Sequence, residues 1–89
     1  MVCYFKKTFL KDLADIPGAY RRKVERLVFE DIPKLQHITG KLDIRKIRGY
    51  ENYYRIRLGN YRIGCQIQAE SKIIFYRVKS RKDIYKVFP

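Results

Sequence analysis

The stretch YYRIRLGNYRIGCQIQ, residues 53–68, alternates apolar and polar side chains on both sides of Gly59-Asn60. A Gly-Asn pair between two alternating runs is typical of a two-residue β-hairpin turn, so it predicts strands over 53–58 and 61–68. Because neighbouring side chains on a strand point to opposite faces, this hairpin has an apolar face and a polar face. The apolar face is expected to be core and carries Tyr54, Ile56, Leu58, Tyr61, Ile63, Cys65 and Ile67.

The polar face of the hairpin is basic. The turn sets Arg57 opposite Arg62, where two like charges repel by about a few tenths of a kcal/mol, so selection for stability alone would not place them there. Gly64 falls opposite Arg55, and its missing side chain predicts a gap that the backbone of a bound molecule can approach. The pattern favours an anionic ligand such as a phosphate chain. A basic face that is merely solvated is the alternative.

A third strand is expected over 72–80, joined to the second through Glu70-Ser71. If those two residues form a tight turn, the face that carries the arginines gains Arg77 and Lys79. The same register pairs Ile67 with Ile74, Cys65 with Tyr76, and Ile63 with Val78.

The first part of the chain predicts a β-prone segment followed by two helices. Val2 to Lys6 is β-prone, and Thr8 is expected to cap a first helix that runs to Ile16 before Pro17-Gly18 interrupts it. A second, longer helix follows, with an apolar stripe from Tyr20 to Ile32, and Pro33 ends or kinks it.

The segments after the second helix are harder to assign. Part of the stretch from Gln36 to Asn52 is predicted as a strand or an extended loop. After Ser80 we expect at most a short strand or turn, with no closing helix. The fold class is therefore α+β in the order β-α-α-β-β-β, with a helical hairpin packed on a mostly antiparallel twisted sheet.

Size and charge narrow the class of protein. A length of 89 residues predicts one domain, residues 1–89, and 46% apolar content argues for a folded globule rather than disorder. A formal net charge of +12 points to nucleic acid, an acidic protein or an anionic membrane as partner. Basic residues are densest over 41–62, where tyrosines interleave with them on expected strands. Membrane-surface binding usually needs a basic amphipathic helix instead.

Cysteine usage and the amino terminus suggest an intracellular protein. Cys3 and Cys65 are too few for a disulfide scaffold and do not form a metal-ligand pair, so both are expected to be reduced packing residues and no metal site is predicted. Lysines break the short apolar start, which predicts neither a signal peptide nor a membrane span. We therefore expect a cytoplasmic location.

Four short stretches in a fixed order carry a family resemblance: IRG at 47–49, YRIRL at 54–58, YRI at 61–63 and VKSRKDIY at 78–85. Together with the element order they resemble the RelE/ParE toxin superfamily, and most closely its RelE branch. RelE-type toxins are small basic α+β proteins of type II toxin–antitoxin systems, which enter the ribosomal A site and cut the mRNA there. The resemblance implies a RelE-like toxin domain and a metal-independent endoribonuclease, or mRNA interferase, that inhibits translation without a cofactor. It also implies three partners, an acidic cognate antitoxin, the ribosome and mRNA, with no membrane and no small-molecule cofactor.

The resemblance assigns site residues as well. The catalytic cations and the closing tyrosine of the family fall on Arg55, Arg57, Arg62, Arg81 and Tyr85. Further cations that we expect to bind RNA are Arg48, Arg77, Lys79 and Lys82. In this class the 2′-hydroxyl of the RNA attacks the adjacent phosphate and leaves a 2′,3′-cyclic phosphate and a free 5′-hydroxyl. Guanidinium groups suit the developing charge because they donate paired, charge-assisted hydrogen bonds to phosphate oxygens. Tyr85 is expected to stack on a base or orient the phosphate rather than to transfer a proton.

Two departures from the family pattern leave the proton acceptor open. Arg55 and Arg57 stand where relatives usually have lysines, and a guanidinium stays protonated in any working protein. Lys79-Ser80 stands where relatives often have Gly and His. Glu51 is a candidate base only through its proximity in sequence, and His37, the one histidine, is expected to be a surface or capping residue.

Two other functions stay open on the sequence. One is a ParE-like toxin that poisons DNA gyrase and cuts no RNA, and the other is a non-catalytic RNA-binding module. Fold does not distinguish them, because function resides in the site residues. The combined arginine and tyrosine set favours RNA cleavage, since gyrase poisons of this fold generally lack it.

Overall fold

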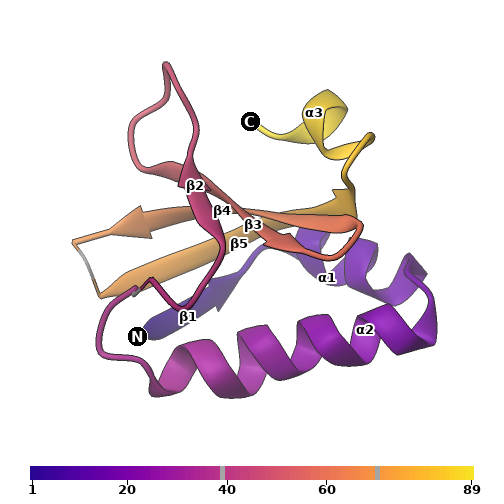
Figure 1. Ribbon diagram of the computed structural model, residues 1–89, viewed down its shortest axis with the longest axis horizontal. Helices are drawn as coiled ribbons and strands as arrows, with labels where there is room; N and C mark the ends of the chain where they lie inside the picture. Colours follow the sequence, from indigo (N-terminus) through magenta and orange to yellow (C-terminus); the bar gives the residue numbers. More distant parts are fainter. Residues whose placement is uncertain (39, 70) are drawn as a thin grey trace.

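The computed structural model describes residues 1–38, 40–69 and 71–89, and its framework is a five-stranded sheet in the order β1-β5-β4-β3-β2 (Figure 1). β1 runs parallel to β5, and the other neighbouring pairs are antiparallel. The expected α+β class and mostly antiparallel sheet are therefore confirmed, and a short β2 falls in the stretch that was hard to assign. The strands are β1 (Val2–Phe5), β2 (Ile44–Lys46), β3 (Tyr53–Leu58), β4 (Tyr61–Gln68) and β5 (Lys72–Ser80).

Two helices cover one face of this sheet. They are α1 (Lys7–Asp15) and α2 (Gly18–Glu25), and α2 continues as a π-helical segment, Arg26–Asp31, and a 3₁₀ turn, Ile32–Lys34. The predicted helical hairpin is confirmed, and the second helix ends at the turn that contains Pro33. In the described part of the chain, no helix combines the length and the apolar character that crossing a membrane requires.

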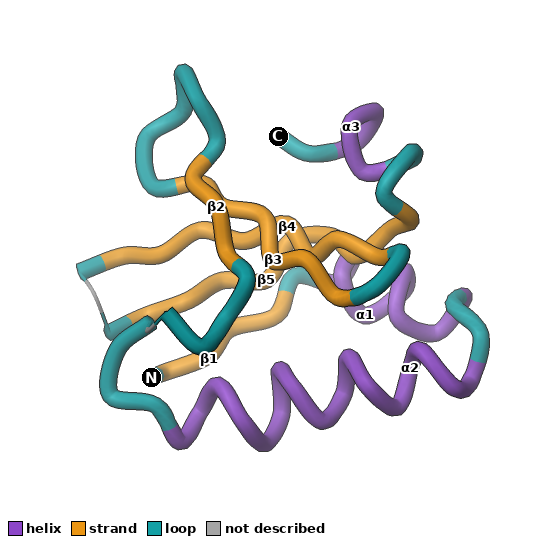
Figure 2. Tube along the Cα trace, in the orientation of Figure 1, coloured by secondary structure: helices purple, strands orange, loops and turns teal. Residues whose placement is uncertain are grey.

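A short third helix, α3 (Ile84–Val87), corrects the expectation that no closing helix exists. Figure 1 shows α3 on the side of the sheet opposite α1 and α2, and Figure 2 shows that a loop connects it to β5. Ile84 and Phe88, four residues apart, are buried against the sheet with Ile47. This burial stabilises a segment that is too short to be stable as an isolated helix.

The start of α1 also differs from expectation. The helix begins at Lys7, Lys6 is its N-cap residue, and no side chain caps it. Thr8 does not cap the helix, because its Oγ1 donates to the backbone carbonyl of Tyr76, 3.0 Å away. The hydroxyl therefore links α1 to β5.

The register of the first hairpin is the predicted one. Leu58 pairs with Tyr61, Arg57 with Arg62, and Arg55 with Gly64, and Gly59 adopts a φ of +58° that the turn requires and glycine tolerates. The predicted core face is confirmed as well. Ile56, Ile63 and Cys65 are buried in the main hydrophobic core, and the other four residues of that face are partly buried and pack against it: Tyr54, Leu58, Tyr61 and Ile67.

The register between β4 and β5 is only partly the predicted one. Ile63 pairs with Val78 as expected, but Cys65 pairs with Phe75 and Ile67 with Ile73, so the predicted partners Tyr76 and Ile74 are wrong. A β-bulge at Tyr76 shifts the pairing by one residue. The bulge lets Phe75 and Val78, which an unbroken strand would place on opposite faces, both enter the core. Of the expected Glu70-Ser71 turn, Glu70 lies outside the described residues.

Both cysteines are free thiols, as predicted. Cys65 is fully buried in the core and Cys3 is partly buried. Burial raises the pKa of each thiol, and in Cys3 the nearby amino terminus opposes that rise. Their chemistry is that of small apolar side chains.

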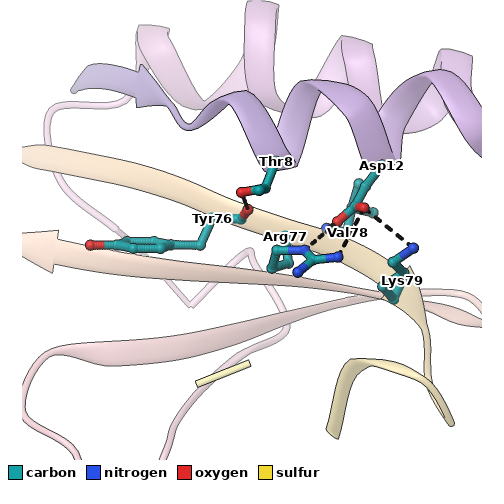
Figure 3. A network of polar contacts seen from close by, with 6 residues as sticks. All are labelled: Thr8, Asp12, Tyr76, Arg77, Val78 and Lys79. Atoms are coloured by element: carbon teal, nitrogen blue, oxygen red, sulfur yellow. Dashed lines mark hydrogen bonds and ion pairs between the residues drawn. The ribbon is translucent and has the colours of Figure 1, made fainter. Parts of the chain in front are cut away.

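A buried carboxylate ties α1 to β5 (Figure 3). Asp12, only 4% exposed, accepts from Nε of Arg77 at 2.7 Å and from the backbone N–H of Val78 at 3.2 Å, and it lies 3.3 Å from Nζ of Lys79. Burial alone would raise the pKa of Asp12, but the hydrogen bonds from Arg77, Val78 and Lys79 outweigh it and hold this pKa below its ordinary value.

Replacing this carboxylate gives the first prediction. We expect Asp12→Asn to lower the free energy of unfolding at pH 7 by about 2–3 kcal/mol, less than for a fully buried ion pair because both cations stay partly exposed. A carboxyl group whose pKa is lowered in the folded state stabilises the fold at pH values above its unfolded pKa of about 3.9. That stabilisation is lost as the pH falls through the folded pKa. The urea unfolding curves of the two proteins should therefore begin to converge only below about pH 4 and merge as the pH falls through the folded pKa of Asp12.

The matched control is Asp15→Asn, which removes an exposed carboxylate from the same helix. It should change the free energy of unfolding by less than about 0.5 kcal/mol at every pH. Equal effects of the two substitutions at pH 7 would contradict a specific role for Asp12.

Candidate functional site

A pocket of about 320 Å³ opens on the sheet face that α1 and α2 leave uncovered. Cross-strand pairing builds it, because Arg45 of β2 pairs with Arg55 of β3, and Arg57 of β3 pairs with Arg62 of β4. We call it the arginine pocket. The residues that line it are Arg45, Lys46, Arg55, Arg57, Arg62 and Tyr85.

Local contacts moderate the repulsion between these like charges. Nε of Arg57 lies 3.7 Å from a carboxylate oxygen of Asp43, and Nε of Arg45 lies 3.9 Å from the other. The guanidinium of Arg62 donates to the carbonyls of Gly59 and Tyr61 at 2.8 and 2.9 Å. Exposed ion pairs at these separations contribute little, and carbonyls carry no net charge. The pocket therefore keeps most of its positive potential and suits an anion.

Arg55 contacts the C-terminal segment. Its guanidinium carbon lies 4.4 Å from the ring centroid of Tyr85, and its Nη2 donates to the carbonyl of Phe88 at 3.3 Å. Its Nε is buried and has no hydrogen-bond partner among the described residues. Tyr85 is 67% exposed. The C-terminal segment thus fixes Arg55 through a cation–π contact and still presents tyrosine surface to solvent.

The gap predicted at Gly64 is filled, which corrects that expectation. A Cβ atom on Gly64 would lie 2.4 Å from a ring carbon of Phe88, closer than real side chains approach. Glycine is needed here because an aromatic ring of the protein's own C-terminal segment rests on the strand. A ligand backbone has no access at this position.

The other predicted residues lie around the pocket or away from it. Four of the five predicted catalytic residues line it, and the fifth, Arg81, is exposed beside it, where its backbone N–H donates to the carbonyl of Asn60 in the β3–β4 turn. Arg48 and Lys82 are exposed on turns and do not line the pocket. Arg77 and Lys79 bind Asp12 where β5, unpaired with β1 beyond Phe75, forms an open edge (Figure 3). Their charges are therefore partly compensated.

Sequence reasoning missed two lining residues, Arg45 and Lys46. The signal was the density of basic residues over 41–62, but only the pairing of β2 with β3 shows that Arg45 stands beside Arg55. His37 is exposed on the helical side of the sheet with Tyr54 and is therefore a surface residue, as predicted. Glu51 is exposed and does not line the arginine pocket.

Comparison with known proteins gives a consistent result. A family model described as "ParE toxin of type II toxin-antitoxin system, parDE" matches residues 4–85. "Toxin RelE3" of Methanocaldococcus jannaschii is 49% identical over 90 residues, which covers 100% of both chains. A solved RelB–RelE antitoxin–toxin complex from Methanococcus jannaschii matches with a TM-score of 0.80 and 49% identity, over 97% of this chain and 99% of that one. An archaeal RelE–RelB complex from Pyrococcus horikoshii matches with a TM-score of 0.62 and 26% identity, over 90% and 93% of the two chains.

The contact between Gly64 and Phe88 gives a second prediction. We expect Gly64→Ala to cost about 1–3 kcal/mol of unfolding free energy, because the added methyl group overpacks against the ring. In a Phe88→Ala background the same substitution should cost at least about 1 kcal/mol less, since the ring is gone. Chemical denaturation of the four proteins in this double-mutant cycle measures the difference.

Gly40→Ala is the control, because a Cβ at Gly40 meets nothing within 4 Å. It should be close to neutral in both backgrounds. Additive effects of Gly64→Ala and Phe88→Ala would show that the ring does not rest on Gly64.

Proposed function

Because this chain belongs to the RelE/ParE family of toxins from type II toxin–antitoxin systems, we propose that it is an mRNA interferase that cuts mRNA in the ribosomal A site and so inhibits translation. The observation that carries the proposal is the arginine pocket, in which four guanidinium groups and an exposed tyrosine surround about 320 Å³. A guanidinium recognises phosphate oxygens through paired charge-assisted hydrogen bonds. An RNA phosphate is the ligand that this lining fits best.

The reaction is an internal transesterification. The 2′-oxygen of one nucleotide forms a bond to the adjacent phosphorus and loses its proton, while the bond from phosphorus to the 5′-oxygen breaks and that oxygen gains a proton. Negative charge grows on the phosphate oxygens in the transition state. Arg57 and Arg62, which face each other across β3 and β4, stabilise that charge from fixed positions.

Each remaining residue has a role that follows from its position. The guanidinium groups stay protonated, so in this mechanism they bind the phosphate and stabilise its negative charge. They do not accept the 2′-hydroxyl proton. Arg81, beside the β3–β4 turn, contacts a neighbouring phosphate. Tyr85 stacks on a base next to the cut, because this residue is largely exposed and its ring lies over Arg55.

The proposal includes partners. The solved relatives are antitoxin–toxin complexes, and a chain with 21 basic and 9 acidic residues attracts an acidic protein. We therefore assign it a cognate acidic antitoxin, together with the ribosome and mRNA as targets. A toxin that acts on ribosomes works in the cytoplasm, where we place it.

A second candidate is a ParE-like inhibitor of DNA gyrase, which the description of the matching family model favours. The arginine pocket supports the first candidate, because charge of this density is suited to a reacting phosphate. A non-catalytic RNA-binding module would use the same cations for phosphate contacts alone.

Substitution in the pocket tests the proposal directly. We expect Arg57→Ala to slow cleavage of mRNA on programmed ribosomes about 10²- to 10³-fold, the usual effect of removing one group that stabilises transition-state charge. Mapping of mRNA 5′ ends gives the cut sites, and cuts should fall in A-site codons. Arg26→Ala removes an exposed cation from the helical side and should leave the rate within about twofold.

Two parallel assays separate the candidates. Inhibition of gyrase supercoiling without any RNA cleavage would replace the proposal by the ParE-like one. Salt-sensitive RNA binding with neither activity would support the binding module.

The antitoxin gives a further prediction. The rate constant for association with the protein encoded by the neighbouring gene should fall at least about tenfold between low salt and about 1 M salt, where the Debye length is about 3 Å. Stopped-flow fluorescence measures it. A rate constant that does not depend on salt would show that charge does not guide the complex.

A further inference from the structure

Three tyrosines form a continuous aromatic surface next to the arginine pocket. The rings of Tyr50 and Tyr53 are 6.1 Å apart between centroids, and those of Tyr53 and Tyr76 are 5.8 Å apart. They come from the β2–β3 loop, from β3 and from the bulge in β5. We call this surface, Tyr50, Tyr53 and Tyr76, the tyrosine platform.

Contacts with the C-terminal segment hold the platform in place. The ring of Phe88 lies 5.5 Å from Tyr53 and 5.6 Å from Tyr76, and both tyrosines pack on the small core of Ile47, Ile84 and Phe88. Tyr53 and Tyr76 therefore have a structural role as well as exposed surface. Tyr50 is different, because it is 50% exposed and Tyr53 is its one ring contact among the described residues. Tyr50 therefore extends the exposed aromatic surface beyond the two packed rings.

Polar groups border the rings. The hydroxyl of Tyr76 donates to Oε1 of Gln66 at 3.2 Å, and the amide of Gln68 donates to the same oxygen at 3.2 Å. Burial and the neighbouring Tyr53 raise the pKa of Tyr76, so its hydroxyl stays a donor. Nζ of Lys6 lies 5.2 Å from the ring centroid of Tyr76.

The platform lies between two cationic sites. Tyr53 and Arg55 are two residues apart on the same face of β3, so their Cα atoms are about 7 Å apart. At the other end of the platform, Lys6 lies over the ring of Tyr76. Single-stranded nucleic acid binds to surfaces of this type, because its phosphates contact cations while its bases stack on aromatic rings. Sheets that bind RNA commonly present aromatic side chains for this purpose.

We propose that the tyrosine platform is a base-stacking subsite for single-stranded RNA, which holds the unpaired nucleotides next to the phosphate in the arginine pocket. The strand runs from the pocket past Tyr53 and Tyr76 toward Lys6. Amide groups of Gln66 and Gln68 meet base edges along this path. The inference rests on the proposed function, since it takes RNA as the ligand of the pocket.

Direct binding of RNA tests the platform without cleavage. The probe is a short single-stranded RNA with 2′-O-methyl groups, which cannot react, and with one 2-aminopurine base whose fluorescence is quenched when it stacks. We expect Tyr50→Ala to weaken binding about fivefold or more, the low end of the contribution of one base stacked on an aromatic ring, and to reduce the quenching. Tyr50→Phe keeps the ring and should bind within about twofold of the wild type.

The dependence on salt distinguishes stacking from phosphate contact. Tyr50→Ala should leave the slope of log affinity against log salt unchanged, whereas Arg57→Ala should reduce it by about one. Phe29→Ala is the matched control, because it removes a 44% exposed ring from the helical side. It should not change RNA binding, and a thermal unfolding curve checks that each variant is folded.

Equal binding and equal quenching for wild type and Tyr50→Ala would overturn the platform. So would a Tyr50→Ala variant that loses antitoxin affinity but keeps full RNA affinity, because the surface would then bind a protein. The assay also separates this inference from the proposed function. If bases stack at Tyr50 but the protein cuts no mRNA on ribosomes, the proposal of a base-stacking subsite stands and the proposal of an mRNA interferase is rejected.

Discussion

The close approach of Phe88 to Gly64 is the contact on which the functional face depends. A short C-terminal segment has few backbone contacts to hold it, so its position relies on side chains that bury apolar surface. The missing side chain at Gly64 lets the ring of Phe88 rest on β4. From that anchor the segment supports Tyr53 and Tyr76, accepts a hydrogen bond from Arg55, and places the ring of Tyr85 over the same arginine. One glycine therefore organises both the arginine pocket and the tyrosine platform.

Strand pairing also determines which cations line the arginine pocket and which bind Asp12. Hairpin pairing forces Arg57 and Arg62 together, and the cost of their repulsion is limited because both side chains reach solvent. Arg77 and Lys79 follow the same strand alternation, but the open edge of β5 lets them turn toward Asp12 (Figure 3). The buried carboxylate thus stabilises the contact between α1 and β5, partly compensates the charges of Arg77 and Lys79, and holds both side chains outside the arginine pocket. The cations that line the arginine pocket come from β2, β3 and β4, where a phosphate would be held from several sides.

The bulge at Tyr76 changes the side chains that each face of the sheet presents. On the inner face it brings Phe75 and Val78 into one core, although their spacing does not fit an unbroken strand. On the outer face the extra residue is a tyrosine that lies beside Tyr53. Bulges often re-aim a side chain next to a functional site, and here the same irregularity completes the core and extends the aromatic surface.

The sequence by itself determined the hairpin of residues 53–68, its core face, the helical pair, and three of the arginines that line the pocket, Arg55, Arg57 and Arg62. These features depend on local rules: turn chemistry sets a register, and alternation sets a face. Tyr85 is assigned through the family resemblance. Only the tertiary structure decided that Arg45 joins the pocket, that Tyr76 forms a bulge, that Asp12 binds Arg77 and Lys79, and that Phe88 fills the gap at Gly64. None of these features follows from the turn chemistry and alternation of a single predicted hairpin. Such contacts are decided by the competition of side chains for buried space and for charge partners in the folded protein, which local sequence patterns do not encode.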